Sequence, residues 1–108
     1  MKILGAKDFS GQSLQLKGDW SVCFGADWCP FCRAFRAKYE ALDGKVGFSV
    51  AWGDVTDMDT PLWETFGLDV VPTVIAYRDG KALWRKDGAA GVGLDENAIR
   101  GLKKAFKR

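Results

Sequence analysis

Two cysteines separated by two residues are the part of this chain best suited to chemistry. Cys29 and Cys32 lie in the segment Trp-Cys-Pro-Phe-Cys at positions 28–32, between an apolar run at 22–26 and a charged, helix-periodic stretch that begins at Arg33. A helix N-terminus carries partial positive charge and unpaired N–H groups, and both stabilise a thiolate. The pattern therefore predicts a dithiol that can be oxidised to a disulfide and reduced again.

The two sulfurs are predicted to have different roles. Residues three apart share one side of the first helical turn, which places the sulfurs within bonding reach. Cys29, at the helix tip and more exposed, is predicted to attack as a thiolate, and Cys32 to resolve the resulting mixed disulfide. In the loop between them, Pro30 suits a first helical turn because its missing N–H is not needed there. Trp28 and Phe31 are predicted to form an apolar rim where a partner docks.

A zinc site and a pair of inert structural cysteines are the alternatives for such a motif. Zinc normally takes four ligands, whereas this chain has one further cysteine, Cys23, and no histidine. We therefore expect no metal. The lack of histidine also excludes Cys-His and Ser-His-Asp catalysis.

Length and composition predict one soluble globular domain over residues 1–108, with 47% hydrophobic and 28% charged residues. We expect it to be a monomer. The net charge of +2 gives no support for binding to nucleic acid. No apolar run has the length of a membrane span or a secretory signal, so we expect no membrane binding and a cytoplasmic location. A periplasmic or extracellular location is the alternative if a leader has been removed.

Periodicity and turn residues predict the elements that must position the two cysteines. The predicted strands are 2–6, 21–26, 46–52, 70–77 and 81–85, the last two joined by a turn at Asp79 and Gly80. The predicted helices are about three turns from Cys32 to near Gly44, then 59–66 with Pro61 in its first turn, and a last one capped by Asp95 with Ile99, Leu102 and Phe106 inside. A helical turn near Asp8 and Phe9 and a polar loop to Asp19 come before the first buried strand.

This order of strands and helices predicts the fold class. Right-handed crossovers make the early strands parallel and place helices on both faces of the sheet. The class is therefore α/β, with a central mixed sheet of four to five strands. Of the five tryptophans, Trp52, Trp63 and Trp84 among them, most are expected to pack in or against the core, and one could belong to a partner surface.

Two motifs at a matching separation resemble the thioredoxin superfamily. The segment 24–29, Phe-Gly-Ala-Asp-Trp-Cys, is similar to the strand that leads into that family's redox motif, and 70–73, Val-Val-Pro-Thr, is similar to its second signature. The resemblance covers nearly the whole chain. It implies a thioredoxin fold and a thiol-disulfide oxidoreductase that acts on protein disulfides. It also implies no cofactor beyond the disulfide of Cys29 and Cys32, and a reductase or another thiol as electron donor.

The resemblance also implies how a substrate is held. The bond between Val71 and Pro72 would be cis and would pack against the dithiol, whereas the residues alone suggest an edge-strand proline. The backbone of Val71 would pair with an extended segment of the substrate. By this carry-over, the docking surface consists of Trp28, Val71, Pro72 and the loop at Gly88.

The chain departs from the family pattern at two places. Thioredoxins usually bury an acidic residue where this chain has Cys23, which we expect to be a small buried side chain. Asp27 and Asp54 are then the candidate proton acceptors. Secondly, the pair Pro30 and Phe31 resembles glutaredoxins, although the chain has no paired-glycine glutathione site. A glutathione-dependent oxidoreductase and a non-catalytic binding or redox-sensing module therefore stay as alternatives.

Overall fold

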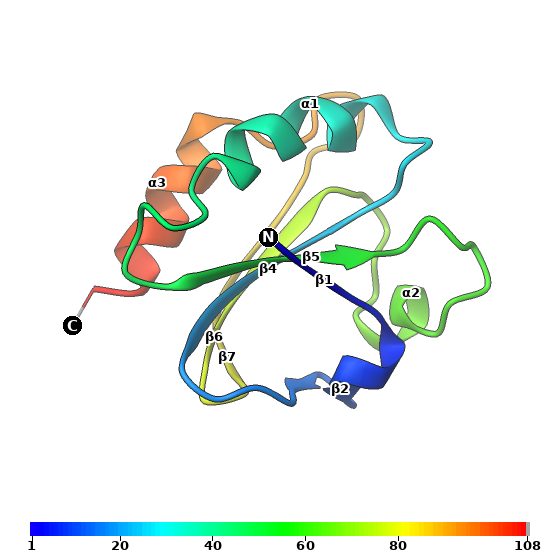
Figure 1. Ribbon diagram of the computed structural model, residues 1–108. Coiled ribbons are helices and arrows are strands. Elements are labelled where there is room, and N and C mark those ends of the chain that lie inside the picture. Colours follow the sequence, from blue (N-terminus) through cyan, green and yellow to red (C-terminus); the bar gives the residue numbers. More distant parts are fainter. Residues whose placement is uncertain (108) are drawn as a thin grey trace.

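The computed structural model describes residues 1–107, in which five strands form a mixed sheet with helices on both faces (Figure 1). The sheet has the order β1-β5-β4-β6-β7, and its strands are β1 (Lys2–Leu4), β4 (Asp19–Gly25), β5 (Ser49–Asp54), β6 (Thr73–Arg78) and β7 (Lys81–Asp87). A separate hairpin consists of β2 (Phe9–Ser10) and β3 (Ser13–Leu14). The helices are η1 (Ala6–Asp8), α1 (Pro30–Glu40), α2 (Leu62–Thr65) and α3 (Glu96–Ala105).

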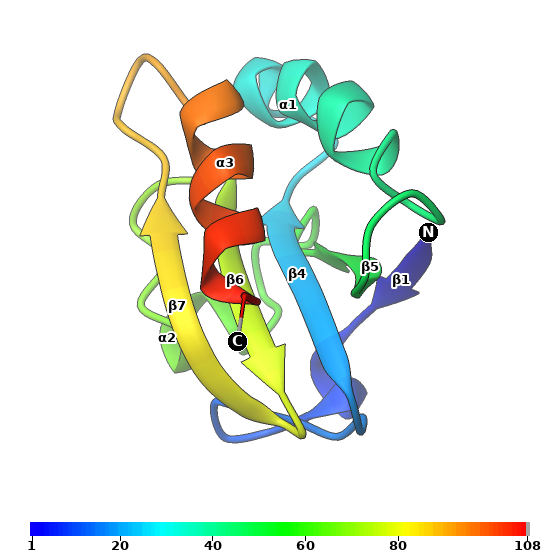
Figure 2. The same cartoon turned by 90° about the vertical axis from the view of Figure 1, so that its left-hand side faces the viewer.

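The strand directions and the two helical layers confirm the predicted fold class. Strands β1, β5 and β4 are mutually parallel, whereas β6 and β7 are antiparallel to their neighbours. Helices α1 and α3 lie on one face of the sheet, and α2 with the β2-β3 hairpin lies on the other (Figures 1 and 2). Within residues 1–107 no helix combines the length and the apolar character that crossing a bilayer requires.

The central strand β4 is buried on both faces, which explains its nearly continuous apolar sequence. Val22, Cys23 and Phe24 are completely inaccessible to solvent. Phe24 packs against Phe66 on the α2 side, with ring centroids 4.7 Å apart. On the α1 side, the hydroxyl of Ser21 lies 2.7 Å from that of Tyr39, which also donates to the carbonyl of Ala51 at 2.9 Å. These bonds fix α1 to β4 and β5.

Several element boundaries differ from the predicted ones. Strand β6 begins at Thr73 rather than at position 70, because Pro72 has no N–H for the ladder. Strand β5 begins at Ser49 instead of 46, and β7 continues to Asp87. Helix α2 has only four residues, and Pro61 is its N-cap instead of part of its first turn. The expected polar loop before Asp19 contains the β2-β3 hairpin, whose two-residue strands are too short to show alternation.

The cap of α3 lies where the sequence predicts it, whereas α1 starts before the predicted Cys32 and ends before the predicted Gly44. Asp95 caps α3 by accepting a hydrogen bond from the N–H of Asn97 at 2.9 Å. Ile99 and Leu102 are buried, whereas Phe106 is half-buried at the C-cap and stacks on Phe48. Helix α1 ends at Glu40, and turns continue the chain from there through positions 41–45.

Candidate functional site

The dithiol lies where the parallel strands end and α1 begins. Strand β4 ends at Gly25, and a short turn then places Cys29 at the N-cap of α1, with Pro30 as the first helical residue. The Sγ of Cys29 accepts a hydrogen bond from the N–H of Cys32 at 3.4 Å. This is the contact with the helix N-terminus that stabilises a thiolate.

The two sulfurs differ in exposure, and both cysteines are free thiols. Cys29 is 7% exposed and Cys32 is 1% exposed, so Cys29 is the one that a substrate reaches first. Burial raises the pKa of Cys32 from its ordinary value of 9.0 to about 12, and its contact with Cys29 acts in the same direction. Cys32 therefore keeps its proton at neutral pH and needs to lose it before it can attack a disulfide.

The loop between α2 and β6 lies against the leading sulfur. The Val71–Pro72 peptide bond is cis, and the thiol of Cys29 donates to the carbonyl of Val71 at 3.7 Å. Gly88 contacts this loop through its N–H, which donates to the carbonyl of Pro72 at 2.9 Å. A Cβ on Gly88 would lie 2.7 Å from that oxygen. The structure thus brings Val71, Pro72 and Gly88 together beside Cys29, with Gly88 buried as a support.

Phe31 rests on the loop that follows β7. A Cβ on Gly93 would lie only 2.8 Å from the Cβ of Phe31, so these two residues are in close contact. Gly93 also has a φ of 78°, which favours glycine. Val92, next to it, is exposed. The sequence did not predict Gly93 as a site residue, because a glycine in a loop does not by itself indicate a contact with the dithiol loop.

Trp28 forms a stack with a second tryptophan. The rings of Trp28 and Trp63 are 6.1 Å apart at an interplanar angle of 13°. The indole N–H of Trp28 donates to the carbonyl of Thr56 at 3.0 Å, and that of Trp63 donates to the carbonyl of Asp57 at 3.2 Å. Trp28 is 50% exposed, as a rim residue should be. Trp63 is half-buried, so it packs against the core and also stacks on the residue that precedes Cys29.

The two carboxylates predicted as proton acceptors are held near the dithiol loop. Asp54 accepts from both the hydroxyl and the N–H of Thr56, at 2.6 and 3.0 Å. Asp27 is exposed, and its carboxylate lies 3.8 Å from a guanidinium nitrogen of Arg36. Among residues 1–107, neither carboxylate hydrogen-bonds a cysteine.

Cys23 lies inside the sheet, on the strand that leads to the dithiol. It is completely buried, and burial raises the pKa of its thiol well above the ordinary value, with Cys32 acting in the same direction. A neutral, inaccessible thiol packs as a small apolar side chain. Within residues 1–107, no three cysteine, aspartate or glutamate side chains gather as a metal site would require.

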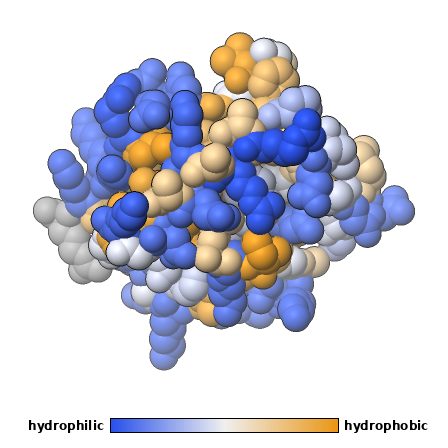
Figure 3. Space-filling model, turned by 45° about the horizontal axis from the view of Figure 1, so that its top comes forward, coloured by the Kyte–Doolittle hydropathy of each residue, from blue (hydrophilic) through white to orange (hydrophobic). Residues whose placement is uncertain are grey.

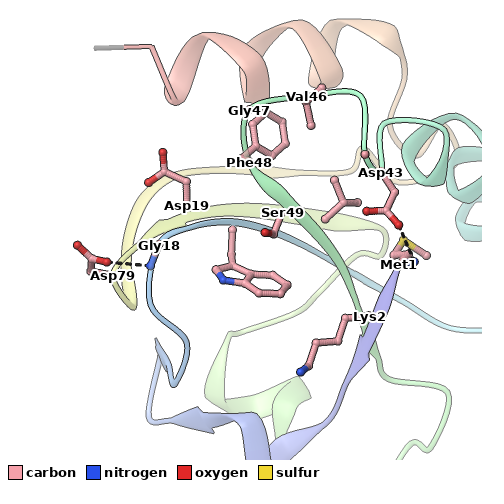
Figure 4. A pocket seen from close by; sticks show the side chains of 13 residues that line it. Met1, Lys2, Gly18, Asp19, Asp43, Val46, Gly47, Phe48, Ser49 and Asp79 are labelled. Carbon is pink, nitrogen blue, oxygen red and sulfur yellow. Dashed lines mark hydrogen bonds and ion pairs between the residues drawn. The ribbon is translucent and has the colours of Figure 1, made fainter.

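The surface on the α1 side carries its apolar side chains in separate patches. Figure 3 views the α1 side and shows hydrophobic groups surrounded by hydrophilic ones. A depression of about 790 Å³ lies at the N-terminal ends of β4 and β5, away from the dithiol. Lys2, Asp43 and Ser49 are among the residues that line it (Figure 4). It shares no residue with the dithiol site.

Comparisons with known proteins agree with this geometry. A family model described as Thioredoxin matches residues 1–99. Thioredoxin from Chlamydia caviae is 33% identical over 89 residues, which cover 82% of this chain and 84% of that protein. A solved thioredoxin variant from Halobacterium salinarum is 26% identical, with a TM-score of 0.70 and coverage of 99% of this chain and 92% of that one. Thioredoxin f2 from Chlamydomonas reinhardtii has a TM-score of 0.75 at 17% identity, covers 94% and 92% of the two chains, and supports the fold alone.

The fold and the dithiol at the start of α1 define a thiol-disulfide oxidoreductase. The chain belongs to the thioredoxin family. Membership implies protein disulfides as substrates and a reductase as partner, and thioredoxins typically need no cofactor.

Proposed function

We propose that this protein reduces disulfides of other proteins, with Cys29 as the nucleophile and Cys32 as the resolving thiol. The observation that carries the proposal is the hydrogen bond from the N–H of Cys32 to the Sγ of Cys29, at the N-terminus of α1. It holds the more exposed sulfur where negative charge is stabilised, with the second cysteine three residues away.

The reaction has two exchange steps. First, the thiolate of Cys29 attacks one substrate sulfur, a bond forms between them, and the other substrate sulfur leaves as a thiolate. Next, Cys32 loses its proton and attacks the Sγ of Cys29, which forms the internal disulfide and releases the second substrate thiolate. Two electrons pass from the dithiol to the substrate, and a reductase or another thiol donor returns them.

The proton of Cys32 is the demanding part of the second step, because burial raises the pKa of this thiol to about 12. Asp27 pairs with Arg36, and Asp54 is held by Thr56. We propose that the substrate thiolate released in the first step takes the proton, since that thiolate is formed beside the dithiol.

The substrate is held by the loop beside the dithiol. Val71, whose carbonyl lies 3.7 Å from the sulfur of Cys29, offers its backbone to an extended segment, as in other cases of strand addition. Pro72 is next to it in the cis bond, and the exposed Trp28 lies directly before Cys29. Phe31 and Pro30 complete the rim on the α1 side. We further propose that the protein acts as a monomer in the cytoplasm, where thiols are kept reduced.

Single substitutions of the three cysteines test the assignment in insulin reduction with dithiothreitol. We expect Cys29→Ser to abolish the activity, and Cys32→Ser to accumulate a mixed disulfide with the substrate that mass spectrometry detects. Cys23→Ala is the matched control, and it should keep the activity because Cys23 is buried away from solvent. Full activity of Cys29→Ser would remove Cys29 as the nucleophile.

The direction and the location are tested together by the reduction potential of the pair, measured against glutathione. A potential at or below the cytosolic glutathione range of about −220 to −260 mV supports a cytoplasmic reductase. A value near that of strong periplasmic oxidants, about −120 mV, would contradict it.

A further inference from the structure

Two indoles beside the dithiol form a fixed apolar surface. Trp28 and Trp63 are stacked, and each N–H is bonded to a carbonyl of the same loop, those of Thr56 and Asp57. With both N–H groups satisfied, the exposed parts of the rings present only apolar surface and aromatic faces. Met58, on the same loop, is 69% exposed.

The segment that carries this surface is strongly acidic. From position 46 to 77 the sequence contains no lysine or arginine, whereas Asp54, Asp57, Asp59, Glu64 and Asp69 all fall in this range. These five side chains are exposed, and none of them forms an ion pair within residues 1–107.

Three arginines outside this segment have partners elsewhere. Arg85 donates to the carbonyl of Phe66 at 2.7 Å and pairs with Asp87 at the same distance, so its charge is balanced. Arg33 and Arg36 lie on α1 and donate to, or pair with, Asp27. The helix that begins at the dithiol thus carries arginines, whereas the segment that carries Trp63 has exposed carboxylates without ion pairs within residues 1–107.

We propose that the Trp28–Trp63 stack and the acidic segment 54–69 form a docking site for a basic stretch of the substrate protein that carries a large apolar side chain close to its disulfide. The proposal deepens the proposed function and rests on it. It assigns substrate preference to Trp63, Asp59 and Glu64, none of which hydrogen-bonds a cysteine within residues 1–107.

The properties of the surface account for both features of the proposed substrate segment, its apolar side chain and its basic residues. An apolar side chain laid on the indoles removes apolar area of both partners from water. A lysine or arginine gains from the carboxylates and from the faces of the tryptophan rings, which attract cations. An acidic stretch would meet uncompensated like charge instead, so the site discriminates by repulsion as well as attraction.

The test uses short peptides dimerised through one cysteine, so that the two sulfurs of each disulfide are equivalent. One peptide has lysine and leucine near the cysteine, the second has glutamate in place of lysine, and the third has serine in place of leucine. Each carries a fluorophore that is quenched in the dimer. Every rate is divided by the rate with dithiothreitol, which corrects for the intrinsic reactivity of the disulfide.

We expect the wild-type protein to reduce the lysine peptide about tenfold faster than the glutamate peptide at low salt, within the range of electrostatic effects on association. The preference should shrink at high salt. The double variant Asp59→Lys, Glu64→Lys should abolish or invert it, and Trp63→Ala should remove the advantage of leucine over serine.

Charge controls are Ser49→Lys and Ala82→Lys, introduced separately and together at exposed positions at the ends of β5 and β7 that lie away from the dithiol, so that the pair matches the net-charge change of Asp59→Lys or Glu64→Lys introduced alone. They raise the net charge without touching the acidic segment and should keep the lysine preference. Equal normalised rates for the lysine and glutamate peptides, or an unchanged preference after Asp59→Lys, Glu64→Lys, would overturn the inference. Failure of the wild type to reduce insulin would contradict the proposed function itself, whereas insulin reduction with equal peptide rates contradicts the docking site alone.

Discussion

The bond between Tyr39 and Ser21 is predicted to hold α1, and with it the dithiol, on the sheet. Both side chains are completely buried, and the hydroxyl of Tyr39 reaches Ser21 at 2.7 Å and the carbonyl of Ala51 at 2.9 Å. The substitution Tyr39→Phe removes both hydrogen bonds, each worth about 1 kcal/mol, and leaves the buried hydroxyl of Ser21 without a partner. We expect a loss of about 2–3 kcal/mol in the free energy of unfolding.

A double-mutant cycle measured by urea denaturation isolates this contact. Ser21→Ala alone should cost about 1 kcal/mol, because Tyr39 still donates to Ala51, and the double variant should cost less than the sum by about 1 kcal/mol. Tyr77→Phe is the matched control, since its hydroxyl donates to the carbonyl of Gln12 at 3.1 Å on the other side of the sheet. Costs of Tyr39→Phe and Ser21→Ala that simply add, to within about 0.3 kcal/mol, would refute the reasoning.

Two further predictions concern the dithiol loop and its chemistry. Gly93→Ala should lower the free energy of unfolding by more than Gly91→Ala, because both glycines have positive φ but only a Cβ at Gly93 meets Phe31. Equal losses in urea denaturation would argue against that contact. Separately, the raised pKa of Cys32 keeps its thiol neutral when folded, whereas the unfolded chain ionises near 9.0. Stability from this group is complete below pH 9.0 and is lost as the pH rises towards about 12, so Cys32→Ser should flatten the fall of the urea midpoint above pH 9. If the urea midpoint of that variant fell just as steeply above pH 9, the ionisation of Cys32 would not be a cause of the loss of stability.

The sequence predicted the features that depend on neighbouring residues. A cap at Asp95, a turn at Asp79 and Gly80, and a helix that starts at the cysteine pair are all local signals, and each lies where the pattern places it. The mixed sheet followed from the order of elements, because crossover handedness leaves few arrangements.

Contacts between distant segments were not predictable in the same way. The stack of Trp28 on Trp63 joins two residues 35 positions apart, and nothing in either neighbourhood distinguishes Trp63 from a tryptophan that only packs. The support of Phe31 by Gly93 depends on the path of the loop after β7. The orientation of the Asp54 carboxylate depends on its hydrogen bond with Thr56, and only the fold determines where the two side chains lie.

Thr56 links the dithiol loop to the acidic segment, and this determines what docking there can do. Its hydroxyl accepts from the N–H of Asp27 at 2.9 Å and donates to Asp54 at 2.6 Å, and its carbonyl accepts from the indole of Trp28 at 3.0 Å. The residues directly before Cys29 and the start of the acidic segment are therefore connected by short hydrogen bonds. A substrate held by that segment is positioned relative to the sulfur, because the two parts cannot move independently without breaking these bonds. The substrate preference should consequently appear in the rate of the exchange step as well as in binding.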